Sequence, residues 1–79
     1  MVIEIRIEYS TGRLELKDDT KKRHNFWIGE LKGRTVTIHF GKVGAVGHAG
    51  SREFRTDKDA RDFLSKRLKQ KVEEGYKRV

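Results

Sequence analysis

Apolar and charged residues alternate at the start of the chain, with an isoleucine at every second position from Ile3 to Ile7. A period of two is typical of a strand with one buried face, so residues 2–9 are expected to form a strand. Residues 10–13 have the composition of a turn, and Leu14 and Leu16 resume the alternation. This pattern predicts a hairpin of two strands.

A second hairpin is predicted in the middle of the chain. Residues 17–24 are polar and charged and are expected to form a loop, and residues 26–31 are rich in aromatic and aliphatic side chains. A tight turn at residues 32–33 then leads to residues 35–40, which are β-branched and alternating. A last short strand is expected at residues 51–55.

A change of period predicts one helix in the last third of the chain. Apolar residues recur there at spacings of three and four, which marks one helical face: Ala60, Phe63, Leu64, Leu68 and Val72. Thr56 is the expected N-cap and Gly75 the expected residue after the last turn. The predicted fold class is therefore α+β, with about five antiparallel strands and one C-terminal helix packed on them.

The charge of the chain predicts the kind of partner that it binds. The chain has 79 residues, enough for a single domain over residues 1–79, with the strand at about residues 2–9 as its first element. It carries 19 Lys and Arg against 12 Asp and Glu, a formal net charge of +7, which attracts polyanions. There is no long apolar run and no cysteine. We expect a cytoplasmic protein with no membrane partner, and association with the nucleoid as an alternative.

The positive charge is concentrated in two stretches. Between residues 32 and 56 the only acid is Glu53, and residues 17–24 carry more cations than carboxylates. By contrast, cations and carboxylates are mixed along the expected helix, which is typical of a solvated surface. The middle of the chain is therefore the candidate surface for a polyanion.

Catalytic and metal-binding patterns are not recognisable. The histidines His24, His39 and His48 are far apart in sequence and no cysteine accompanies them, so no metal and no cofactor are expected. The glycines of residues 41–47 lack the Gly-Lys-Ser/Thr of a phosphate-binding loop and are interpreted as turn and bulge glycines. We expect a non-catalytic binding module rather than an enzyme.

Phe40 has two interpretations. It is in register with Val36 and Ile38, and this pattern by itself favours a core position. Alternatively, its ring stacks on a base or a sugar while Lys42 meets a phosphate. His48 could add a hydrogen bond to a phosphate.

The ordered set of motifs resembles the WGR domain, which is named for a Trp-Gly-Arg signature at the end of a central strand. The similarity runs from about Arg13 to Tyr76, with Asn25 to Ile28 resembling an aromatic stretch of the family and Phe40-Gly41-Lys42 in place of the signature. In poly(ADP-ribose) polymerases this domain binds DNA ends or breaks and communicates with neighbouring domains. The resemblance implies a stacking role for Phe40 and a cationic role for Lys42, although Phe has less area than Trp and Lys lacks the planar fork of Arg.

The expected function is nucleic-acid binding, to DNA rather than RNA, mainly through phosphate and sugar contacts with little sequence specificity. The alternative is a protein-interaction or regulatory module that docks an acidic partner, and a monomer is expected in either case. The residues expected to carry binding are Phe40 for stacking, Lys42, His48 and Arg52 for phosphate or sugar contacts, and Arg34, Lys21, Lys22 and Arg23 for electrostatic attraction.

Overall fold

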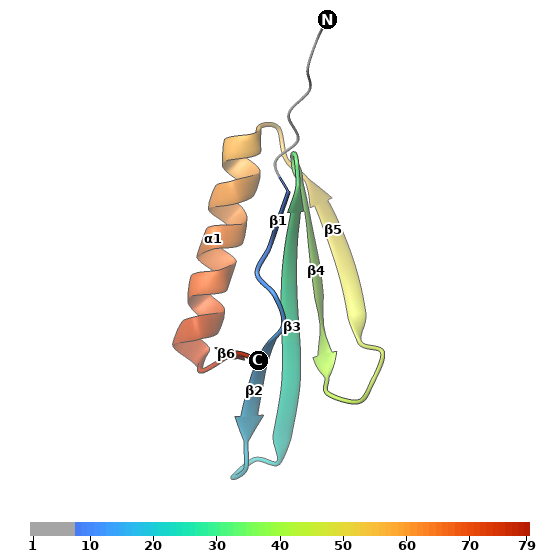
Figure 1. Ribbon diagram of the computed structural model, residues 1–79, viewed down its shortest axis with the longest axis vertical. Coiled ribbons are helices and arrows are strands. Elements are labelled where there is room, and N and C mark those ends of the chain that lie inside the picture. Colours follow the sequence, from blue (N-terminus) through green and yellow to red (C-terminus); the bar gives the residue numbers. More distant parts are fainter. Residues whose placement is uncertain (1–7) are drawn as a thin grey trace, which may run out of the picture.

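One antiparallel sheet carries a single helix on one face in the computed structural model, which describes residues 8–79 (Figure 1). In this part of the chain the elements are β1 (Glu8–Ser10), β2 (Leu14–Asp18), β3 (Arg23–Lys32), β4 (Thr35–Lys42), β5 (His48–Glu53), α1 (Asp57–Glu74) and β6 (Lys77–Arg78). The strand order is β5-β4-β3-β2-β6, and β1 pairs with β3. The predicted α+β class is confirmed, with six strands over the described residues.

The central hairpin of β3 and β4 is the longest pairing of the sheet. Its register runs from Asn25 opposite Lys42 to Lys32 opposite Thr35, and a two-residue turn closes it. The hairpin predicted here is confirmed. Strand β3 is longer than predicted because it has partners on both sides, so part of the loop expected at residues 17–24 belongs to β2 and β3.

The hairpin predicted at the start of the chain is wrong. Strands β1 and β2 do not pair with each other, because both lie along the same edge of β3. Thr11 lies between them and exchanges two hydrogen bonds with Gly29: its N–H donates to the Gly29 carbonyl, and its hydroxyl accepts from the Gly29 N–H, both at 2.9 Å. The turn residues thus bend one edge strand instead of reversing it. The strand expected at residues 2–9 lies mostly outside the described residues.

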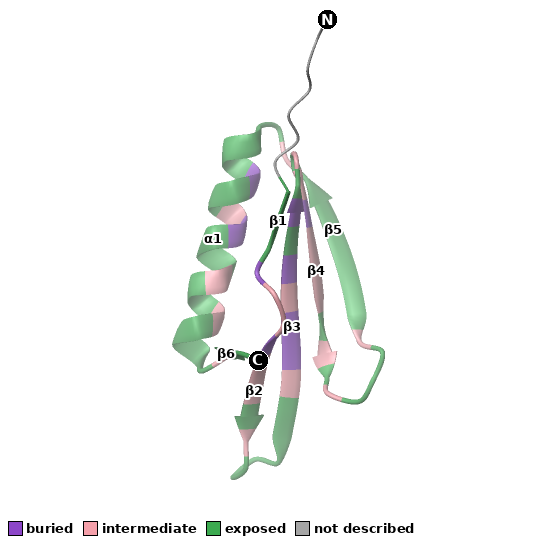
Figure 2. Cartoon of the chain, in the orientation of Figure 1, coloured by how far each residue is buried: buried purple, intermediate pink, exposed green. Residues whose placement is uncertain are grey.

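The core lies between α1 and one face of the sheet (Figure 2). Trp27 and Leu31 of β3 are buried there against Leu64 of α1. Gly29 stands between them in β3, and a Cβ at that position would lie 2.5 Å from Leu64 Cδ1. The helix therefore packs directly on the backbone of β3. Burying a leucine side chain in this way contributes about 1.5–3 kcal/mol.

The predicted helix ends are confirmed. The Thr56 hydroxyl accepts a hydrogen bond from the Asp59 N–H at 3.1 Å, and Gly75 closes the helix with a φ of 109°. Val72, by contrast, does not belong to the buried face, since its exposed fraction is 56%. Each step of four residues turns the helix by about 40° beyond a full circle, so three such steps from Ala60 carry Val72 off the sheet.

Candidate nucleic-acid interface

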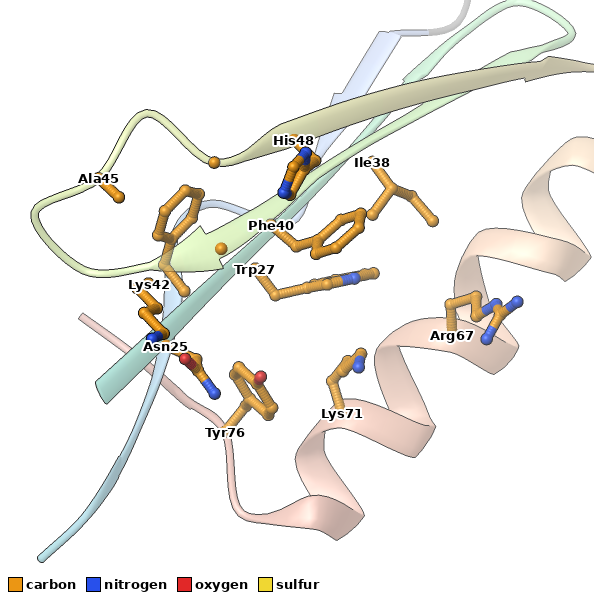
Figure 3. Close-up of a pocket in the computed structure, with 13 residues that line it drawn as sticks. Asn25, Trp27, Ile38, Phe40, Lys42, Ala45, His48, Arg67, Lys71 and Tyr76 are labelled. Carbon is orange, nitrogen blue, oxygen red and sulfur yellow. The ribbon is translucent and has the colours of Figure 1, made fainter. Parts of the chain in front are cut away.

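A groove with a volume of about 730 Å³ opens between the C-terminal half of α1 on one side and the end of β4 and the start of β5 on the other (Figure 3). One wall comes from the sheet and carries Phe40, Lys42 and His48. The other wall comes from α1 and the residues after it, and carries Arg67, Lys71 and Tyr76. Elements distant in sequence thus bring aromatic rings and cations together.

The sheet wall is built at the end of the central hairpin. Phe40 lies opposite Trp27 in the register and on the same face as Val36. Its exposed fraction is 47%, whereas Val36 is buried at 1%, so the core interpretation of Phe40 is wrong. The physical reason is that the groove separates this end of β4 from α1. His48 lies opposite Phe40 on β5, with the ring centroids 5.8 Å apart.

The loop between β4 and β5 is held against the back of the sheet by Phe26. This ring is buried on the face opposite the helix, and a Cβ at Gly47 would lie 2.8 Å from its Cζ and 2.5 Å from the Phe40 carbonyl oxygen. Gly47 also has a φ of 78°, which favours glycine. His39 contacts the Val46 carbonyl through Nε2 at 2.9 Å. These contacts support the interpretation of the loop glycines as structural and fix where the sheet wall ends.

The helix wall was missed by the sequence analysis, which assigned the charges of the helix to a solvated surface. At 3.6 residues per turn, Arg67 and Lys71 lie about 20° on either side of the buried Ala60, so both face the sheet. Their spacings of seven and eleven from Ala60 are the signal that could have found them. The Lys71 ammonium lies 5.2 Å from the Tyr76 ring centre and 3.3 Å from Glu74.

The charged side chains that line the groove are all cations. Among the described residues, its lining includes Lys42, Arg67 and Lys71 but neither aspartate nor glutamate. Cations that line one concave surface raise the local concentration of anions. The arrangement is therefore suited to an anionic ligand that also presents a flat apolar face.

Five of the predicted cations do not line the groove, and two of these, Arg52 and Arg34, lie away from its end of the hairpin. Arg52 is on the helix side of β5 but opposite Val36, where its guanidinium lies 4.8 Å from the ring centre of Phe54. Arg34 is the second residue of the two-residue turn between β3 and β4, at the end of the hairpin opposite the groove. It forms an ion pair of 3.2 Å with Glu53.

The predicted basic group of Lys21, Lys22 and Arg23 lies at the turn between β2 and β3, and all three residues are exposed. Figure 1 places this turn at the same end of the sheet as the end of β4. The Asp18 carboxylate accepts hydrogen bonds from the backbone N–H groups of Thr20 and Lys21, which orders the turn. These cations extend the positive surface beyond the groove without lining it.

The opposite face of the sheet carries a different cluster. Glu15 contacts Arg13 Nε and His24 Nε2, both at 2.7 Å. The hydrogen bonds from Arg13 and then from His24 hold the pKa of Glu15 below its ordinary value. Within residues 8–79 no group of three His, Cys, Asp or Glu side chains is arranged to hold a metal ion, and no helix there is long and apolar enough to cross a membrane.

Comparison with known proteins identifies the family. The WGR domain model matches residues 10–79, which is nearly the whole chain. The chain belongs to the WGR domain family. WGR domains are modules of a nucleic-acid-binding type, and here Phe40-Gly41-Lys42 takes the place of the signature at the end of β4.

Two comparisons match this WGR domain to parts of larger proteins. It is 29% identical over 56 residues to the uncharacterized protein YfeS of Escherichia coli strain K12, a match that covers 71% of this chain and 23% of YfeS. The crystal structure of a Bacteroides fragilis protein superposes with a TM-score of 0.76 at 23% identity, covering 92% of this chain and 19% of that one. The second likeness shows the fold alone. The chain spans less than a quarter of either protein.

Proposed function

We propose that this WGR domain binds DNA without catalysing a reaction, mainly through phosphate and sugar contacts and with little sequence preference. The observation that carries the proposal is the groove, whose lining in the described part of the chain combines the exposed ring of Phe40 with cations and includes neither aspartate nor glutamate. Lys42 and Lys71 bind phosphates from opposite walls, and the Phe40 ring stacks on a base or a sugar. Phosphate contacts position a nucleic acid but do not read its sequence.

The surrounding cations add long-range attraction. Lys21, Lys22 and Arg23 are exposed at the same end of the sheet as the groove, where they draw a polyanion toward it. Arg67 belongs to the groove itself. Arg34 contributes least, because it lies at the other end of the hairpin from the groove and forms an ion pair with Glu53.

The proposal predicts a strong dependence on salt. If about five phosphates are neutralised, log K plotted against log salt concentration falls with a slope of roughly −3.5 to −4.5. Fluorescence anisotropy with a labelled DNA hairpin, titrated at several salt concentrations, measures this slope. A binding curve that does not change with salt would contradict the proposal.

Charge reversal at one position tests the groove itself. Lys42→Glu should weaken binding about tenfold for every DNA sequence tried and make the salt slope shallower, because a phosphate contact is lost. Lys58→Glu makes the same change of charge at an exposed position in the first turn of α1, outside the groove, and should change affinity less than twofold. Equal effects of the two variants would show that only net charge matters. Absence of binding at low salt would instead favour an acidic protein partner.

A further inference from the structure

The position of the Phe40 ring restricts the form of nucleic acid that the groove accepts. Phe40 lies on the inner wall of the groove, on the side of the sheet that faces α1 (Figure 3). Resting on the proposed function, we propose that the groove binds an unpaired, single-stranded stretch of DNA in preference to base-paired duplex. The inference follows from the ring, the volume of the groove and the placement of its cations.

The ring is the first argument. The faces of bases inside a duplex are covered by the neighbouring base pairs, so a protein ring stacks on a base only where the base is unstacked. About half of the Phe40 side chain is exposed, and His48 stands beside it at 5.8 Å between ring centroids. This platform matches one base at a time, and a single strand offers such bases along its whole length.

The volume is the second argument. At about 730 Å³, the volume of the groove falls in the range of sites that bind a small organic ligand. A single nucleotide is a ligand of that size. A duplex is a convex rod and would meet the rims of the groove, formed by α1 and the β4–β5 loop, before its bases reached Phe40. A flexible single strand enters the groove and turns its bases toward the ring.

The cations are the third argument. Lys42 lies on the sheet wall, and Arg67 and Lys71 lie on the helix wall, so positive charge flanks the aromatic platform on both sides. A strand that crosses the groove places the phosphates before and after a stacked base near opposite walls. Grooves that combine a charged track with aromatic rings are typical of single-strand binding.

Two probes separate unpaired bases from free ends. The first is a labelled, covalently closed circle of about 30 thymidines, which has neither base pairs nor ends and exceeds one binding site. The second is a blunt-ended duplex of the same length, which has ends but no unpaired bases. Anisotropy titrations at one low salt concentration should show the circle bound at least about tenfold more tightly than the duplex.

Variants of the ring connect this preference to Phe40. Phe40→Ala should lower affinity for the circle about tenfold and affinity for the duplex less than twofold, and Phe40→Trp should retain binding to the circle because it keeps a stacking face. Val46→Ala is the matched control, since Val46 is an exposed apolar side chain on the adjacent loop that does not line the groove. Circular dichroism melting checks that each variant remains folded.

The outcomes distinguish this inference from the proposed function. Duplex binding as tight as circle binding, or an equal loss for both probes in Phe40→Ala, would overturn the single-strand inference and leave DNA binding intact. Failure of both probes to bind at low salt would overturn the proposed function itself.

Discussion

Glu15 is the residue with the clearest electrostatic role outside the groove. Its carboxylate contacts Arg13 and His24 on the back of the sheet, and these contacts lower its pKa. A carboxyl group whose pKa is lower in the folded state stabilises the fold at pH values above its unfolded pKa. That contribution is lost as the pH falls through the folded pKa.

Replacing this carboxylate should therefore change the acid side of the stability profile. Glu15→Gln should have a lower free energy of unfolding than the parent at neutral pH, and the difference should disappear as the pH falls below about 4.3, the ordinary pKa of glutamate. Urea denaturation at a series of pH values measures both curves. Curves that stay the same distance apart down to about pH 2 would contradict a role for the charged form.

Among single residues, three that line the groove were predicted from the sequence. The sequence did not show that the other candidate residues lie away from the groove. Phe40, Lys42 and His48 are close in sequence and meet at the hairpin end. Arg52 is also close to His48 in sequence. Because β5 runs antiparallel to β4, however, each residue after His48 lies farther from the groove. Register, not distance along the chain, decides which cations gather.

Among the elements, α1 determines the second wall of the groove. Ala60 and Leu64 fix one side of the helix against β3, and the helical rotation then points Arg67 and Lys71 at the sheet. Lys69, two residues from Lys71, lies about 180° from Ala60 and faces away. The same helix thus supplies a cation inside the groove and a matched one outside it.

This geometry predicts different effects for two neighbouring lysines. Lys71→Gln should make the salt slope of DNA binding shallower by about one, because one phosphate contact is lost, and Lys69→Gln should leave the slope unchanged. Salt-dependent anisotropy titrations of both variants measure the slopes, with thermal melting as a control for folding. Identical slopes for the two variants would contradict the assigned orientation of the helix.

How well an element could be predicted depended on how local its causes are. The caps of α1 depend on Thr56 and Gly75 alone and were predicted correctly. The first hairpin was predicted wrongly because the turn composition near Thr11 fits either a reversal or a bend. The partner that decides between them is Gly29, far along the chain.

For the molecule as a whole, the two faces of the sheet have different compositions. The helix side ends in the groove, whose lining over residues 8–79 includes Lys42, Arg67 and Lys71 but no Asp or Glu, and the other side holds Glu15 paired with neighbouring basic groups. The proposed binding of a nucleic acid is therefore directed to one face and one end of the domain. Composition gave the net charge of the chain, but only the fold shows on which face and at which end the cations gather.

An NMR titration with DNA tests this directional binding most directly. Amide shifts of the domain are followed as a labelled DNA hairpin with a single-stranded tail is added at low salt. The account predicts that the largest shifts cluster at Asn25, residues 40–48 and residues 67–76, around the groove. Shifts centred instead on Glu15 and His24 at the back of the sheet, or no shifts at all, would contradict it.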